Sequence, residues 1–156
     1  MIPEDQQLLK DLLTHQRVLS LSVLIDDAPY TGLLPYVMLP DLSAALIHAS
    51  NLAKHTRGLQ PKAPFSALIH QPDRPDLDPQ QLPRVSLQGS VQKLPRESAA
   101  YPRSRDIYLA KFPASAQTFM LGDFNLYALT IEKGRFVAAF GRIYNLSVAT
   151  LQGLVS

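Results

Sequence analysis

One stretch of sequence decides the fold, because in it a short apolar strand runs into a segment rich in cations and hydroxyls: Leu46-Ile47-His48-Ala49-Ser50-Asn51-Leu52-Ala53-Lys54-His55-Thr56-Arg57-Gly58-Leu59. Ser50 or Asn51 can cap a short helix, and Gly58 stands where a left-handed residue would end that helix. The first turn of such a helix leaves backbone N–H groups without an intrahelical partner. Those groups would face whatever lies beyond the end of the strand.

The side chains of the same segment add further hydrogen-bond donors. They belong to Lys54, His55, Thr56 and Arg57. A strand-to-helix turn with free N–H groups and nearby cations is a natural site for a phosphate, although no glycine-rich phosphate loop is present. Two interpretations therefore stay open at this point: a phosphate site, or a capped surface helix whose cations are only solvated.

Composition limits the class of protein. The chain has 156 residues, of which 46% are hydrophobic and 18% charged, which indicates one globular domain over residues 1–156. The lack of cysteine excludes a disulfide framework, a thiolate metal site and a cysteine nucleophile. Because the net charge is only +2 and the basic residues are scattered, we do not expect a nucleic-acid partner.

The N-terminus and the hydropathy favour a soluble, unprocessed protein of the cytoplasm. The chain begins Met-Ile-Pro-Glu-Asp, with acids where a signal peptide would carry positive charge. No apolar run approaches the ~18 residues that suggest a membrane span. We therefore expect no membrane partner.

The first half of the chain combines one helix with several strands. Apolar spacing predicts a helix over residues 3–15, and period-two alternation predicts strands over 18–25 and 30–39 that form a hairpin. Pro35 cannot donate to a ladder, which places its strand at an edge or a bulge. A third strand over 44–49 follows in meander order, and this pattern indicates an antiparallel sheet or barrel.

The second half keeps this mainly antiparallel character, so the predicted fold class is α+β. Strands over 64–70 and 84–94 flank a proline-rich loop, 71–83, which either covers a neighbouring site or extends into solvent. Beyond them we expect a helical segment over 96–121 interrupted at Pro102 and Pro113, a hairpin of strands 123–132 and 135–141 with Lys133-Gly134 as its turn, and a terminal helix over 146–155.

Few other side chains are candidates for ligand binding, metal binding or catalysis. Arg84 and Gln88 lie on the polar face of the alternating strand, where they either face water or reach a bound polar ligand. His48 and His70 are interpreted as partly exposed polar residues of the sheet, and we expect no metal site. No Ser/His/Asp triad or carboxylate pair marks a catalytic group, so the catalytic residues are unassigned.

In its order of elements the chain resembles the FMN-binding split barrel of the pyridoxamine 5′-phosphate oxidase-like superfamily. Within that superfamily it is most similar to the haem-utilisation split-barrel branch. The resemblance runs from the first helix to Phe140-Gly141. It rests on residues 26–30 (Asp-Asp-Ala-Pro-Tyr), 50–57, 84–91 (Arg-Val-Ser-Leu-Gln-Gly-Ser-Val), 123–127 (Asp-Phe-Asn-Leu-Tyr) and 135–142 (Arg-Phe-Val-Ala-Ala-Phe-Gly-Arg).

This resemblance implies a split β-barrel with flanking short helices that forms a homodimer with FMN at the subunit interface. It agrees with the phosphate interpretation of the strand-to-helix segment. The implied cofactor-binding residues are Thr31, Gly32, Leu33 and Leu34 through the backbone, Ser50, Asn51, Lys54, His55, Thr56 and Arg57 around the phosphate, and Arg84 and Gln88 as polar contacts.

The chain also departs from its relatives. It has no tryptophan and no match to the C-terminal arginine-bearing segment of true pyridoxamine phosphate oxidases. The haem-degrading relatives carry a further C-terminal domain and a haem-binding histidine near the chain end, whereas the last histidine here is His70.

Three functional hypotheses follow. The first is an FMN-dependent oxidoreductase of an unidentified small molecule, in which the flavin itself would carry the redox chemistry. The second is a flavin- or haem-binding module without turnover. The third is a ligand-free split-barrel dimer that serves as an interaction protein.

Overall fold

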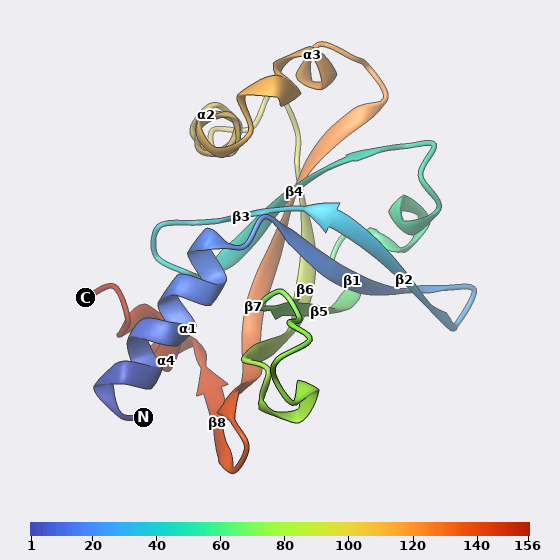
Figure 1. Cartoon of the computed structure of the whole chain (residues 1–156). Coiled ribbons are helices and arrows are strands. Elements are labelled where there is room, and N and C mark those ends of the chain that lie inside the picture. The colour runs from blue at the N-terminus through green and yellow to red at the C-terminus, as the bar shows by residue number, and fades with distance from the viewer.

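The computed structural model describes every residue, 1–156, and contains one coiled antiparallel sheet with short helices around it (Figure 1). The strands are β1 Val18–Ile25, β2 Ala28–Pro35, β3 Val37–Met38, β4 Ala44–Ser50, β5 Pro64–His70, β6 Arg84–Leu94, β7 Phe124–Ala139 and β8 Arg142–Ser147. The helices are α1 Pro3–His15, α2 Tyr101–Lys111, α3 Ala116–Phe119 and α4 Val148–Gln152, with the 3₁₀ segments η1 Lys54–Gly58, η2 Pro79–Gln81 and η3 Pro113–Ser115. The strand order is β2-β1-β5-β6-β7-β4-β3, and β8 pairs with β7.

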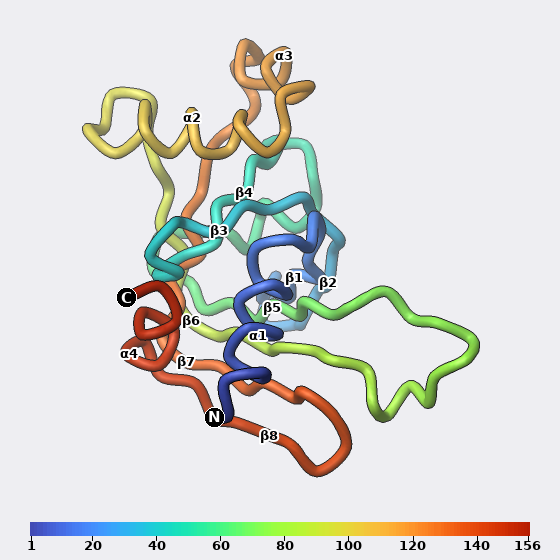
Figure 2. Tube along the Cα trace, turned by 60° about the vertical axis from the view of Figure 1, so that its left-hand side comes forward, coloured from blue at the N-terminus to red at the C-terminus, as the bar shows by residue number.

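The strongly periodic elements are confirmed. The helix over residues 3–15 and the strands over 18–25, 64–70 and 84–94 have the predicted bounds, and β4 runs one residue beyond the predicted 44–49. In each of these elements a local apolar pattern faces the core. The proline-rich loop between β5 and β6 extends away from the sheet (Figure 2).

The second predicted hairpin is wrong, because β7 is one continuous strand through Lys133-Gly134. It pairs with β6 over the whole length of β6, with a bulge between Gln88 and Gly89. At Gly134 a Cβ atom would lie 2.9 Å from the carbonyl oxygen of Ser86, so this glycine permits a close approach of strands and does not make a turn. The chain turns instead at Gly141, whose φ is +79°, and returns as β8.

The first three predicted strands pair in sequence order, but the middle one is divided, and its two parts lie at opposite edges of the sheet. The predicted strand over 30–39 is two strands, β2 and β3, separated by Tyr36. β2 pairs only with β1, whereas β4 pairs with β7 and β3. Pro35 ends β2 at one edge of the sheet, as its missing N–H predicts.

The helical predictions need smaller corrections. Pro102 does not interrupt a helix, because it stands in the first turn of α2, where a missing N–H costs nothing. The terminal helix is shorter than the predicted 146–155, since Leu146 belongs to β8 and the Ser147 side chain caps α4. No helix is both long and apolar enough to cross a membrane.

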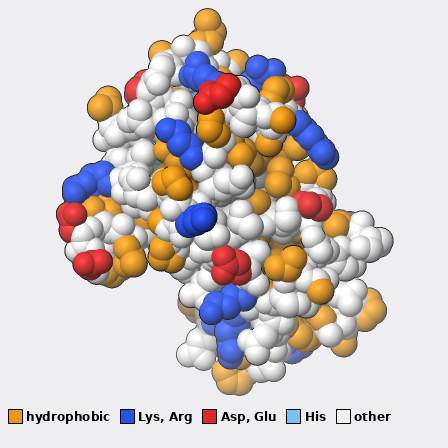
Figure 3. Space-filling model, turned by 180° about the vertical axis from the view of Figure 1, so that it is seen from behind, with side chains coloured by type: hydrophobic (Ala, Val, Ile, Leu, Met, Phe, Trp, Pro, Cys, Tyr) orange, Lys and Arg blue, Asp and Glu red, His pale blue; other side chains and the backbone are white.

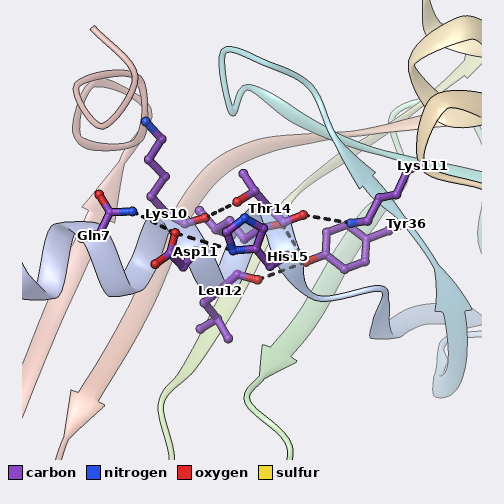
Figure 4. Close-up of polar contacts among 9 residues, drawn as sticks. Gln7, Lys10, Asp11, Leu12, Thr14, His15, Tyr36 and Lys111 are labelled. Atoms are coloured by element: carbon purple, nitrogen blue, oxygen red, sulfur yellow. Dashed lines mark hydrogen bonds and ion pairs between the residues drawn. The ribbon is translucent and has the colours of Figure 1, made fainter.

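Tyr36 closes the sheet. It is the only residue between β2 and β3, which are the first and last strands of the sheet order, so the sheet must curl until its two edges meet there. The buried Tyr36 hydroxyl donates to the carbonyl of Leu13 at 2.8 Å, at the end of α1. Lys111 of α2 lies over the Tyr36 ring and donates to the carbonyls of Thr14 and Gln16, as Figure 4 shows for Thr14.

The apolar core has two parts, one on each face of β7. Tyr127 and Leu129 belong to the larger cluster inside the coiled sheet, which α1 also enters through Leu9. Leu126 and Ala128 belong to a smaller cluster beneath α2 and α3. β7 is therefore buried on both faces in its first half, which explains why its sequence there is almost continuously apolar.

We expect the Tyr36→Phe variant to lose about 1–2 kcal/mol of unfolding free energy, because buried carbonyls at the end of α1 lose their donor. Urea unfolding monitored by circular dichroism measures this change. Tyr30→Phe is the matched control, since the half-buried Tyr30 hydroxyl has no hydrogen-bond partner in the protein. Equal midpoints for both variants would show that closure does not depend on the hydroxyl.

Candidate functional site

The segment after β4 is a turn followed by η1, and the predicted helix caps are wrong. The residue before η1 is Ala53, which makes no side-chain cap. Ser50 still belongs to β4, where it is paired with Phe124 of β7. Its hydroxyl accepts from the N–H of Leu52 at 3.1 Å and donates to Asp123 Oδ2 at 2.8 Å. The strand pairing therefore delays the start of the helical segment to Lys54.

Gly58 has a packing role and not the predicted left-handed one. Its φ is not positive, and a Cβ atom there would lie 2.6 Å from Val23 Cβ and 2.9 Å from the carbonyl oxygen of Leu24. Only glycine lets η1 lie this close to β1. Because η1 rests on β1, the side chains that it carries are held against the first hairpin.

Several predicted phosphate contacts are already used within the protein. The Thr56 hydroxyl donates to the carbonyl of Ser50 at 2.6 Å, and Asn51 Oδ1 accepts from Asn125 at 2.8 Å. Together with the bond from Ser50 to Asp123, these contacts fix the shape of the turn. Asp123 is not among the predicted site residues, because its approach to Ser50 depends on the pairing of two strands far apart in sequence.

The cations of η1 remain available. Lys54 Nζ lies 4.8 Å from the centre of the Tyr30 ring and makes no ion pair. Arg57 pairs with Asp26 at 3.0 Å, but both side chains are exposed, so this pair is weak.

His55 lies at the junction between η1 and β2. A Cβ atom on Gly32 would be 3.3 Å from its Nδ1, which shows that the ring packs against the backbone of β2. Its Nε2 is buried and has no partner, and burial lowers its pKa. The structure thus places Lys54 and His55 beside residues 30–34 of β2.

The other predicted residues are divided between the two faces of the sheet. Gly32 faces His55, and Leu34 is in the core, whereas Thr31 bonds to Ser22 and Leu33 is 69% exposed on the outer face. Gln88 is also on the outer face. Arg84 donates to the carbonyls of Leu82 and Gln80 at the base of the long loop. One chain alone therefore does not gather all the predicted residues around one point.

His48 is the main surprise among the polar side chains, because it is buried and not partly exposed as predicted. Its ring stacks on Phe119 at 3.7 Å between centroids, and its Nδ1 lies 3.3 Å from Thr118 Oγ1. Its Nε2 has no partner. Burial, with a smaller contribution from Arg96, lowers its pKa to about 4. The helices α2 and α3 cause this burial, and no local pattern around His48 reveals it.

The histidine and acidic side chains of the surface do not gather into a metal-binding group. His70 is exposed at the end of β5, as predicted. No three histidine or acidic side chains are gathered as they would be around a metal ion. On the face seen in Figure 3, Lys and Arg side chains lie singly or in small groups among apolar, neutral and acidic ones.

Solved structures with the same fold provide the comparison. The heme binding protein of Mycobacterium smegmatis superposes with a TM-score of 0.83 at 22% identity, over 98% of this chain and 62% of that one. HutZ, the heme storage protein of Vibrio cholerae, gives 0.71 at 18% identity over 81% and 89%. The FAD and heme binding protein of M. smegmatis gives 0.66 at 14% identity over 90% and 81%. No protein-family model and no curated protein matches the sequence.

These likenesses define the class of fold. The chain has the split-barrel fold of the pyridoxamine 5′-phosphate oxidase-like proteins, an antiparallel half-barrel with short flanking helices. It spans about 62% of the length of the first of these proteins.

Acidification should test the environment of His48. An unfolded chain takes up this proton near pH 6.5 but the folded one only near pH 4, so the histidine lowers stability as the pH falls through this window. In the His48→Phe variant this loss is absent, so its unfolding free energy should rise relative to the unaltered protein between pH 6.5 and 4.5. Urea midpoints at several pH values measure the difference.

The exposed His70 offers the control. His70→Gln should follow the pH dependence of the unaltered protein. If the curves of His48→Phe and the unaltered protein stay parallel, His48 is not buried as a neutral imidazole.

Proposed function

We propose that this protein is a split-barrel module that binds a redox cofactor, a flavin or a haem, without an established turnover of its own. The observation that carries the proposal is the packing of Lys54 and the unpartnered His55 against residues 30–34 of β2. The printed descriptions of structures with this fold, which name haem and FAD as ligands, support the same cofactor classes.

The residues of this region fit an FMN phosphate in part. Lys54 and Arg57 supply two cations, and the exposed Arg57–Asp26 pair can open at little cost. The Ser50 hydroxyl already donates to Asp123, and the Thr56 hydroxyl donates to the carbonyl of Ser50. These two hydroxyls would therefore stabilise the turn and would not donate to the ligand. When bound, FMN would supply the redox chemistry, and the protein would orient it.

Haem is the second candidate, and His55 is the observation that favours it. Burial lowers the pKa of its imidazole, and its Nε2 has no partner within the protein. A neutral imidazole nitrogen is the usual protein ligand of haem iron. Flavin and haem would therefore depend on different side chains of η1, Lys54 for the first and His55 for the second.

We also propose that two copies pack through the outer face of the sheet, with the cofactor at their interface. This face carries exposed apolar side chains, namely Leu24, Leu33 and Leu68. Leu33 and Leu68 lie in one row across β2, β1 and β5, on either side of Ser20, and contiguous exposed apolar side chains mark interaction sites. A partner on this face would also give Arg84 and Gln88 a ligand to contact, which one chain alone does not.

Titration with FMN and with haemin, followed by visible absorption and size exclusion, tests this proposal. If FMN binds, Lys54→Gln should weaken it by about tenfold, because a charge-assisted contact to the phosphate is lost. Lys10→Gln on α1 removes the same charge far from η1 and should leave the affinity unchanged.

If haemin binds, His55→Ala should abolish the histidine-ligated spectrum, and His70→Ala should preserve it. Failure of both cofactors to bind a monodisperse protein would contradict the proposal and favour the ligand-free dimer. Reduction of bound FMN by NAD(P)H with oxygen consumption would show that the protein is an oxidoreductase and not only a binding module.

A further inference from the structure

The outer face of the sheet holds a polar hollow that shares only Gln88 with the residues assigned to the cofactor. It has a volume of about 450 Å³, and no apolar residue lines it. Its lining residues are Ser66, Ser86, Gln88, Lys133, Gly134, Arg135 and Asn145. We propose that this hollow binds a phosphate-class oxyanion, either free phosphate or the phosphate group of a small phosphomonoester.

Strand register gathers these side chains in two neighbouring rows. Ser66 of β5 is opposite Gln88 of β6, which is opposite Lys133 of β7. The second row places Ser86 opposite Arg135, which is opposite Asn145 of β8. Directly opposed Cβ atoms in a sheet lie roughly 4.5–5.5 Å apart, so side chains from four strands converge over a small area.

The hollow is positively charged without compensation. Lys133 and Arg135 are two residues apart on one strand and therefore share a face. Neither makes an ion pair, whereas other arginines of the chain do pair with acids: Arg57 with Asp26, Arg74 with Asp76, Arg105 with Asp106 and Arg142 with Asp5. No acidic residue lines the hollow. An anion between the two cations would relieve their mutual repulsion.

The same side chains have unused donors. Ser66, Ser86, Gln88 and Lys133 make no hydrogen bond within the protein through their side chains. Arg135 donates one bond to Asn145 Oδ1 at 3.2 Å, which holds its guanidinium group and leaves its other N–H groups free. Hydroxyl, amide, ammonium and guanidinium donors around one point match the several acceptor oxygens of a phosphate.

This hollow is separate from the region around η1. Lys54 and His55 pack toward the inner side of β2, whereas the hollow is on the outer face of β5 to β8. Gln88 is the one residue shared with the proposed cofactor contacts, whereas the inference rests on Lys133 and Arg135, so either proposal can fail without the other.

Titration of the ¹⁵N-labelled protein with inorganic phosphate, at an ionic strength held constant with NaCl, tests the inference. We expect saturable shifts of the amide signals of Ser66, Gln88, Lys133, Arg135 and Asn145. The Lys133→Gln/Arg135→Gln variant should lose affinity by at least about tenfold, since charge-assisted bonds are removed. Lys133→Gln alone should give an intermediate loss, which guards against misfolding of the double variant.

A variant with the same change in charge is the control. Lys93→Gln/Arg105→Gln removes two cations outside the hollow and should bind phosphate as the unaltered protein does. An equal loss in this control would overturn the proposal in favour of general electrostatic attraction. Absence of saturation, or shifts confined to residues 54–57, would overturn it as well.

A second titration with glycerol 1-phosphate distinguishes the two sources of the oxyanion. Tighter binding than that of inorganic phosphate supports a phosphomonoester ligand, and equal binding supports free phosphate. The double variant should also keep the FMN affinity of the unaltered protein, if there is any. Loss of FMN in that variant would overturn the assignment of a separate site.

Discussion

The phenol of Tyr36 donates a hydrogen bond to the carbonyl of Leu13 where the first and last strands of the sheet meet. Because Tyr36 alone connects β2 and β3, these two edge strands must lie close together, and the sheet has to curl. Lys111 adds a cation over the same ring and bonds to the carbonyls of Thr14 and Gln16, which ties α2 to the end of α1. Buried carbonyls at a helix end need donors, and this cluster provides them.

Closure at this point determines where the first hairpin lies. β1 and β2 are carried over the segment that follows β4, and Gly58 lets η1 approach Val23 closely. His55 is then pressed against Gly32 with its Nε2 buried. The environment of Lys54 and His55 is therefore set by their packing against the first hairpin, and not by free N–H groups at the end of a helix. This explains why hydroxyls that suggested a phosphate site instead hold the turn together.

The two faces of the sheet offer different chemistry to ligands. On the inner side the imidazole of His55 and the ammonium group of Lys54 adjoin β2. On the outer side lie exposed leucines and the hollow around Lys133 and Arg135. β7 links these environments, because it is buried on both faces in its first half and presents cations in its second. One long strand can do this because side chains alternate between the faces.

The sequence alone determined the periodic elements and the antiparallel character of the sheet. Alternation in residues 18–25 and 84–94 and helical spacing in 3–15 are local signals, and the structure keeps their bounds. These features need no knowledge of distant partners. For the site, only the resemblance to the split barrel, and no local signal, implied that residues 31–34 and 50–57 contact one ligand.

Tertiary structure decided the rest, since it depends on contacts between residues far apart in sequence. The local sequence at Lys133-Gly134 predicts a turn. The strand β6 pairs with residues on both sides of it, so β7 continues through it. The local sequence predicts that Ser50 caps a helix, but its pairing with Phe124 keeps it in β4. The strand pattern predicts a partly exposed His48, but Phe119 stacks on its ring and covers it. In each case the free energy of burial and pairing with a distant segment outweighs the local preference.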